Sequence, residues 1–330
     1  MAILEKPRNL AIAILALGLL SIGPAFSQAY PAKRITMLTS FPPGGGTDFL
    51  ARLVSQKLSE RWGQPVVVDN RVGGNGIVGA RAALGAPADG YTLYMGSSNH
   101  LVMLHAQFDG VPFETLRDLA PVTSVAIQHA ILVVHPSVPA RSVSDLVALG
   151  KARPGDLNFA SPGIGGYEHL AMLHFQALNG IQATHVPYKG SADAVTAILS
   201  GGEVGAMFGS IATVTPHIKA GRLRALTITA AARSTAHPEV PTAGEAGLKD
   251  FVMYSWNGVF APAGTPRDVI GKLNAEIVSI LKQPDVQERL NNVGFLQNGM
   301  KPEEFGALIR SEGERWQRIV RDLGIAKQKL

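Results

Sequence analysis

Residues 35–62 read ITMLTSFPPGGGTDFLARLVSQKLSERW, and the expected fold depends on this stretch. Residues 35–39 are a short β-type run, and residues 49–62 place Leu50, Leu53 and Leu58 on one face of a helix. Three consecutive glycines, at 44–46, stand between the two patterns. A strand that ends in a glycine-rich turn and leads into a helix is the repeating unit of α/β proteins.

The same alternation continues along the chain. Short runs rich in Val, Ile and Leu alternate with helical patterns; the runs are 66–68, 92–95, 130–134, 158–160, 184–186, 204–208 and 223–229, and the helical patterns include 167–178, 192–199 and 269–281. Continuous apolar runs are typical of strands that are covered on both faces. The sequence therefore predicts an α/β class with parallel sheets and crossover helices.

Length and two extended stretches indicate two domains. A chain of 330 residues suggests about two domains. Residues 122–134 form a long apolar stretch in the middle of the chain, and residues 251–262 form a second extended one. We expect the chain to cross between the domains at these two stretches. The helices that follow Pro266 and Pro302 would then complete the first domain.

Composition excludes several classes of protein. The chain is 46% hydrophobic and 17% charged, which is typical of a folded globular protein. It has no Cys, so disulfides, thiolate metal sites and a Cys nucleophile are excluded. The formal net charge is only +5 and its Lys and Arg residues are scattered, which argues against a nucleic-acid partner.

The first 29 residues have the pattern of a secretory signal peptide. Lys6 and Arg8 precede an apolar run at 10–22, and small residues follow up to Ala29. A basic start, an apolar stretch of about 7–15 residues and a small-residue cleavage site define such a peptide. We expect cleavage after Ala29 and export of a protein that begins at Tyr30.

The first glycine turn has the features of an anion site. Gly45 and Gly46 let backbone N–H groups approach a ligand, and Thr47 or Asp48 is a suitable N-cap. A helix N-terminus carries roughly half a positive charge, so a carboxylate or a phosphate would fit there. The alternative is a tight turn that serves only to begin the helix.

Three further turns follow predicted strands in the same way. Their small and polar residues are Ser98 and Asn99, then Ser161, Gly163, Gly165 and Gly166, then Ser210. In open α/β sheets, ligands bind beyond the carboxyl ends of strands. If two of the four turns lie in each domain and face one another, they line a cleft of amides and hydroxyls that binds a small anion without a salt bridge.

Other motifs give only weak indications of a cofactor, metal or catalytic site. Residues 74–79 fit G-x-G-x-x-G, but no acidic residue follows at about 20 positions, where a dinucleotide site needs one. His169 and His174 are five positions apart and so face different sides of a helix, which argues against a shared metal. We therefore expect no cofactor and no metal. An exported α/β enzyme that uses Asp48 or His169 as acid or base stays open as an alternative.

An ordered series of motifs resembles one known family. The segments are FPPGGGTD at 41–48 with Arg52 after it, VDNR at 68–71, GGNG at 73–76, DGY at 89–91, HVPYKG at 185–190, GRLRAL at 221–226, PTAGEAG at 241–247 and WNGVFAPAGTP at 256–266. They resemble the Bug family, the periplasmic solute-binding proteins associated with tripartite tricarboxylate transporters. The resemblance covers essentially the whole chain after the signal peptide.

The resemblance implies a two-domain, type II-like flytrap fold with two hinge-crossing strands. It places domain 1 at about 30–128 plus 253–330 and domain 2 at about 129–252. It also implies that the turns at 44–48 and 161–166 face each other around a carboxylate ligand. Phe41 would border the pocket, and Trp256 would lie in the core of the returning strand.

The implied function is non-catalytic capture of a small carboxylate in the periplasm for a membrane transporter. A sensor that passes its closed state to a membrane signalling protein shares all these sequence features. We expect a monomer. The remainder of the ligand stays open: a dicarboxylate, an amino acid, an aromatic acid and a related amide all fit a site built from backbone amides.

Overall fold

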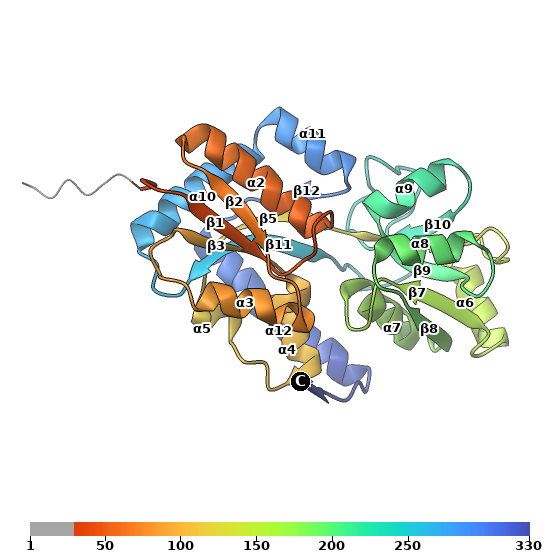
Figure 1. Ribbon diagram of the computed structural model, residues 1–330. Helices are drawn as coiled ribbons and strands as arrows, with labels where there is room; N and C mark the ends of the chain where they lie inside the picture. Colours follow the sequence, from red (N-terminus) through yellow and green to blue (C-terminus); the bar gives the residue numbers. More distant parts are fainter. Residues whose placement is uncertain (1–29) are drawn as a thin grey trace, which may run out of the picture. The chain divides into compact units, whose positions relative to one another are not determined.

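The structure is a computed structural model, and it describes residues 30–330 (Figure 1). Lys33–Leu330 form one compact unit, and the residues before Lys33 belong to a separate one. The expected signal peptide, residues 1–29, lies outside the described residues. Within residues 30–330, no helix combines the length and the apolar character that crossing a bilayer requires.

A six-stranded sheet organises what we call the first lobe. Its order is β12 (Leu296–Gln297), β5 (Leu119–Gln128), β11 (Ser255–Pro262), β3 (Thr92–Ser97), β1 (Ile35–Thr39) and β2 (Val66–Asn70). Helices α2 (Gly46–Trp62) and α10 (Arg267–Leu281) lie on one side of this sheet, and α3 (Ile77–Leu84) and α12 (Pro302–Asp322) lie on the other (Figure 1).

A five-stranded sheet organises the second lobe. Its order is β10 (Arg224–Ile228), β6 (Ala130–Val134), β9 (Ala206–Ser210), β7 (Leu157–Ser161) and β8 (Ala183–Pro187). Four helices pack around it: α6 (Val143–Ala152), α7 (Tyr167–Asn179), α8 (Ser191–Leu199) and α9 (Ile211–Lys219). All strands of the first lobe fall in 30–128 or 253–330, and all strands of the second fall in 129–252. The exact domain boundaries stay a prediction.

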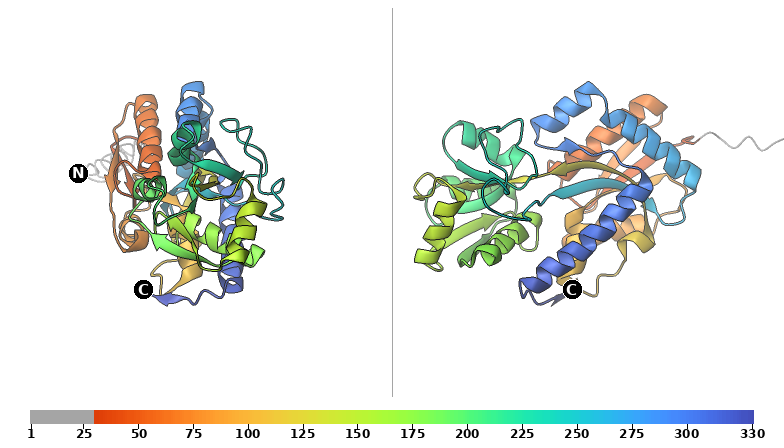
Figure 2. Two further views of the ribbon diagram at one scale, coloured as in Figure 1. Left: turned by 90° about the vertical axis from the view of Figure 1, so that its right-hand side faces the viewer. Right: turned by 180° about the vertical axis from the view of Figure 1, so that it is seen from behind.

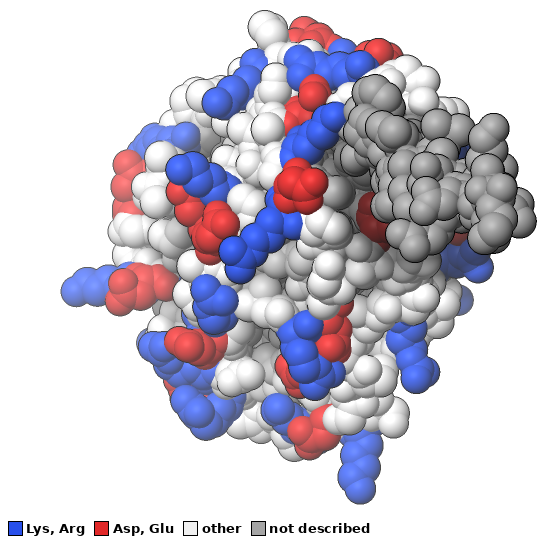
Figure 3. Space-filling model, turned by 90° about the vertical axis from the view of Figure 1, so that its left-hand side faces the viewer, with Lys and Arg blue, Asp and Glu red and all other residues white. Residues whose placement is uncertain are grey.

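The remaining elements are short or lie at the edges. They are η1 (Gly74–Gly76), η2 (Asn99–Met103), α4 (Leu104–Gln107), β4 (Phe108–Asp109), α5 (Thr115–Asp118), α11 (Pro284–Asn292) and β13 (Gln328–Lys329). On the face drawn in Figure 3, Lys and Arg are interspersed with Asp and Glu and form no single basic patch.

The α/β class is confirmed, but the expectation of parallel sheets is wrong. Strand β1 pairs parallel with β2 and β3, whereas β11 pairs antiparallel with β3 and β5. In the second sheet, β7 is parallel to β8 and β9, and β6 is antiparallel to β9 and β10. Strands that enter from the other lobe have no crossover helix to turn them. Buried apolar runs look alike in both directions, so the sequence pattern could not distinguish the two.

The two stretches expected to cross between domains do so. Only His129 separates β5 of the first sheet from β6 of the second, and the return segment leads from β10 to β11 (Figure 2). The crossings are joined to each other: the carbonyl of Met253 accepts hydrogen bonds from His129 Nδ1 and Tyr167 Oη, both at 2.9 Å. The Met253 N–H donates to Thr229 O, also at 2.9 Å.

Aromatic side chains fill the core of the first lobe beneath β11. Trp256, Phe260 and Phe305 are fully buried. The rings of Trp256 and Phe305 meet edge to face with centroids 5.1 Å apart, and those of Phe260 and Phe305 lie 5.2 Å apart. Trp256 is therefore a core residue of the returning strand, as expected. These rings hold the central strand, whose start borders the site.

Candidate functional site

A cavity of about 900 Å³ lies between the two lobes and is lined from both. The first lobe contributes the β1–α2 turn, the segment after β3 and the start of β11. The second lobe contributes the turns that follow β7, β8 and β9. The cavity thus lies at the carboxyl ends of parallel strands, where α/β sheets bind ligands.

Four helices begin at this cavity. Their N-cap residues are Gly45 for α2, Gly166 for α7, Gly190 for α8 and Ser210 for α9, and all four line the cavity. None of these caps has a side-chain hydrogen bond to a backbone N–H of its helix, although Ser210 Oγ lies 3.0 Å from Thr213 Oγ1. The first-turn N–H groups have no carbonyl partner inside their own helix, so they remain available to a ligand. Together with the helix dipoles they favour a negative charge.

Nine of the twelve residues singled out from the sequence line this cavity. They are Phe41, Gly45, Gly46, Thr47, Asn99, Gly163, Gly165, Gly166 and Ser210. The other three, Asp48, Ser98 and Ser161, are buried and are not part of the lining. The structure thus brings the four predicted turns together.

Asp48 supports the first glycine turn from behind the cavity wall. Its carboxylate accepts hydrogen bonds from Gly44 N–H at 2.9 Å, Arg52 Nε at 2.9 Å and Asn70 Nδ2 at 2.8 Å. Burial alone would raise the pKa of Asp48, but these hydrogen bonds outweigh it and hold the pKa below its usual value. The expectation that Thr47 or Asp48 is the N-cap is wrong, because α2 begins at Gly46 and Gly45 is the cap.

The hydroxyl groups of Ser98 and Ser161 also make hydrogen bonds within the protein. Ser98 Oγ lies 3.0 Å from Ser255 Oγ and accepts a hydrogen bond from the Trp256 N–H at 3.3 Å, so it joins β3 to β11. Ser161 Oγ lies 2.6 Å from His185 Nε2 and donates to Gly163 O at 2.8 Å. Each serine fixes a turn that lines the cavity.

Two stacked histidines hold the second glycine turn. His169 Nδ1 accepts a hydrogen bond from Gly165 N–H at 3.0 Å, and its ring stacks on His185 with centroids 4.0 Å apart. Burial, followed by the nearby His185, lowers the pKa of His169 to about 4, which keeps Nδ1 an acceptor at neutral pH. His169 is not part of the cavity lining.

The first lobe adds one lining residue that the sequence pattern did not single out, Asn257, and two polar side chains without a partner in residues 30–330. Asn257 lines the cavity, and its Oδ1 accepts a hydrogen bond from Thr47 Oγ1 at 2.8 Å. Ser97 Oγ and Asn99 Oδ1 are buried at the lining and have no hydrogen-bond partner among the described residues. Asn257 lies 210 positions from Thr47 in the sequence, so no local motif could have paired them.

One side chain bridges the lobes beside the cavity. Gln107 Nε2 donates to Gly165 O at 2.8 Å and to Met103 O at 3.1 Å. The lobes also approach at Gly294, where an added Cβ would lie 2.7 Å from Ala212 N. Both contacts hold turns of the lining in place.

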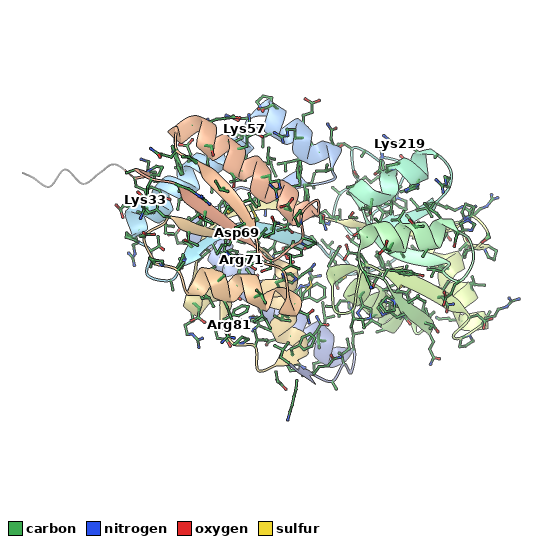
Figure 4. The ribbon with its side chains drawn as sticks, in the orientation of Figure 1. Lys33, Lys57, Asp69, Arg71, Arg81 and Lys219 are labelled. Carbon is green, nitrogen blue, oxygen red and sulfur yellow. The ribbon has the colours of Figure 1, made fainter. Side chains whose placement is uncertain are left out.

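Few charged side chains reach the lining. Among the described residues they are Lys189 and Asp193, which are exposed, and Glu168, which is buried. Lys33, Lys57 and Lys219, which are labelled in Figure 4, are not part of the lining. Within residues 30–330 no cluster of His, Asp and Glu could hold a metal ion. The positive field at the cavity therefore comes mainly from the backbone.

We expect His100, at the cavity wall, to make folding sensitive to acid. Its ring stacks on Phe41 with centroids 4.2 Å apart, and burial lowers its pKa from 6.5 to about 4. His100 therefore takes up a proton at a higher pH in the unfolded chain than in the folded one. The stability that the neutral, buried ring contributes is complete above pH 6.5 and disappears as the pH falls through 4. The free energy of unfolding should drop by about 2–3 kcal/mol from this group between pH 7.5 and pH 4.5.

Chemical denaturation of the wild type and of His100→Gln at both pH values tests this expectation. The glutamine side chain does not titrate, so the variant should lose about 2–3 kcal/mol less stability on acidification. Equal losses in the two proteins would contradict the assignment.

Two α/β lobes joined by two crossing segments, with a cavity at the strand ends, define a solute receptor of the type II-like flytrap fold. Residues 50–325 match the model of the tripartite tricarboxylate transporter family receptor. The chain belongs to this family.

Relatives and solved structures agree. The chain is 42% identical over 294 residues to the UPF0065 protein in the tcbD-tcbE intergenic region of Pseudomonas sp. strain P51, covering 89% of this chain and 87% of the relative. It is 39% identical over 302 residues to protein BugT of Bordetella pertussis, covering 91% and 92%. The resemblance to the Bug family is thereby confirmed.

Two similar structures contain ligands. An R. palustris protein solved with adipate has a TM-score of 0.81 and 32% identity, covering 91% of this chain and all of that one. MatC from Rhodopseudomonas palustris, solved with bound malate, has a TM-score of 0.77 and 30% identity, covering 88% and 100%. The periplasmic binding protein BugD has a TM-score of 0.78 and 27% identity, covering 91% and 100%.

Proposed function

We propose that this protein is a non-catalytic periplasmic receptor that captures a small carboxylate in the cavity and delivers it to membrane transporter subunits. The observation that carries the proposal is the convergence of four helix N-termini on one cavity. A carboxylate placed there accepts hydrogen bonds from free backbone N–H groups and benefits from the helix dipoles. The adipate and malate in two similar structures support the same ligand class.

The proposed ligand contacts are the nine predicted residues of the lining. Gly45, Gly46 and Thr47 act from the first lobe, and Gly163, Gly165 and Gly166 act from the second. The two lobes, domain 1 at 30–128 plus 253–330 and domain 2 at 129–252, close about the crossings near His129 and Met253. The protein acts as a monomer that is exported after loss of residues 1–29. Its closed form presents the surface that the transporter recognises.

A non-catalytic role agrees with where the two alternative acid–base residues lie. Asp48 and His169 are both held in hydrogen bonds behind the lining. A general acid or base has to come within hydrogen-bond reach of the substrate, directly or through one water. The position of both residues outside the lining supports a non-catalytic role.

A thermal-shift panel of small carboxylates and their methyl esters tests the proposal. A ligand at 100 times its dissociation constant should stabilise the folded protein by about 2.7 kcal/mol, and the ester should not, because it lacks the anion. Equal shifts with acid and ester would contradict the proposal, and so would turnover of a bound carboxylate. The screen also names the ligand class.

A further inference from the structure

Three carboxylates of the described chain are buried, and one of them differs from the other two. Asp48 is paired with Arg52 and Asn70. Glu312 is paired with Arg315 at 3.3 Å and with Trp316 Nε1 at 3.2 Å. Glu168 is 8% exposed, and its carboxylate has no hydrogen bond or ion pair with another residue of the described chain. A buried carboxylate is ordinarily paired, so Glu168 lacks the partner that the other two have.

Glu168 lies at the cavity. It is in the first turn of α7 and belongs to the lining. Its Oε2 lies 4.0 Å from where a Cβ on Gly166 would be, so the carboxylate stands over the cap of the helix. The unpaired side chain and the free N-terminus of α7 therefore face the same ligand space.

The charges around Glu168 do not neutralise it. Lys189 and Asp193 line the cavity but are exposed, so water screens them. His100 is neutral above pH 6.5, because burial lowers its pKa to about 4. Burial raises the pKa of Glu168, in keeping with a carboxylate that has no charged partner within residues 30–330. A ligand group could supply that compensation.

A carboxylate ligand can carry a second functional group, and two kinds of such group would interact with Glu168 in opposite ways. A second carboxylate would be repelled by it or would force it to take up a proton. An N–H donor would give the Glu168 carboxylate a hydrogen-bond partner, and an ammonium group would give it a charge-assisted one. A polar group of the site that is left without a hydrogen bond lowers the affinity for any ligand that lacks the matching donor.

We propose that Glu168 selects the second functional group of the ligand, so that the preferred solute is a carboxylate that also carries an N–H donor, as an ammonium or a primary amide. The carboxylate binds at the helix N-termini and the N–H group donates to Glu168. This inference rests on the proposed function and narrows its substrate class.

Calorimetric titration with ligands matched in length tests the inference. The panel contains dicarboxylates of four to six carbons, the ω-amino acids and half-amides of the same lengths, and the aromatic pair terephthalate and 4-carbamoylbenzoate. The wild type should bind the best N–H-bearing member at least about tenfold more tightly than its dicarboxylate counterpart. The ammonium and amide members separate the two forms of donor.

Glu168→Gln keeps the shape of the side chain and removes its charge. We expect dicarboxylates to gain at least about tenfold in affinity and ammonium ligands to lose about as much. Half-amides should change less, because the glutamine carbonyl still accepts from an N–H group. Glu203→Gln, which removes an exposed carboxylate outside the cavity, is the matched control and should leave the order of affinities unchanged.

The outcomes separate this inference from the proposed function. A wild type that binds dicarboxylates as well as their N–H-bearing counterparts overturns the inference and leaves carboxylate capture intact, whether or not the variant folds. An unchanged order of affinities in folded Glu168→Gln also overturns it. Failure of every carboxylate to bind overturns both.

Discussion

Gly46→Val should abolish ligand binding, with a loss of affinity of at least about 100-fold, while the protein stays folded. Gly46 is the first residue of α2 and is exposed at the cavity. A Cβ at this position would lie 3.0 Å from Phe295 Cζ and 3.3 Å from Cε2. Phe295 is itself part of the lining and is 3% exposed, so its ring has little room to retreat.

The effect on binding comes from the backbone that the valine would cover. The N–H groups of Gly46 and Thr47 have no partner among the described residues. Branched methyl groups beside them keep a carboxylate oxygen beyond hydrogen-bond distance, and a displaced Phe295 ring occupies ligand space. Calorimetric titration with the best ligand of the panel measures the loss, and circular dichroism checks the fold.

Gly271→Val is the matched control. Gly271 is an exposed glycine inside α10 of the same lobe, and an added Cβ there would meet nothing within 4 Å. This variant should bind with wild-type affinity. Wild-type affinity in well-folded Gly46→Val, by contrast, would show that the first glycine turn does not hold the ligand.

The sequence predicted the elements well because each depends on local patterns. The run at 130–134 coincides with β6, and the helical pattern at 167–178 falls short of α7 by one residue. Strand direction was missed, because it depends on how the chain enters each sheet from the other lobe. Similarly, the cap of α2 was misplaced because Gly45, which has no side chain, occupies the position that Thr47 or Asp48 could chemically fill.

The sequence pattern identified site residues that lie near the carboxyl ends of strands, and it missed residues that lie elsewhere. Gly163 lies two residues after β7, Ser210 is the last residue of β9, and both line the cavity. The turn before α8 also joins a strand to a helix, but the sequence pattern did not single it out, so Ser191 was missed although it too lines the cavity. Gln107 and Glu168 were not found by their position relative to a strand end. Gln107 reaches Gly165 through a contact 58 positions away in the sequence, and only packing shows that Glu168 lacks a partner.

Phe305→Ala and Gly258→Ala should each destabilise the first lobe. An added Cβ on Gly258 would lie 2.3 Å from Phe305 Cζ and 2.9 Å from the backbone oxygen of Thr123. Phe305 is fully buried against Trp256 and Phe260, so its truncation leaves a cavity and costs about 3–5 kcal/mol of unfolding free energy. The overpacking in Gly258→Ala costs about 1–3 kcal/mol.

The double variant should be more stable than the sum of the two losses predicts. Truncation of Phe305 vacates the space that the methyl group added by Gly258→Ala enters, so the clash disappears and part of the cavity is filled. The Thr123 carbonyl stays 2.9 Å from that methyl position, so the rescue is partial. Urea unfolding of the four proteins gives the coupling energy, which we expect to favour the double variant by about 1–2 kcal/mol. Additive losses would mean that Gly258 is required by the backbone of β5 and not by the aromatic ring that covers β11.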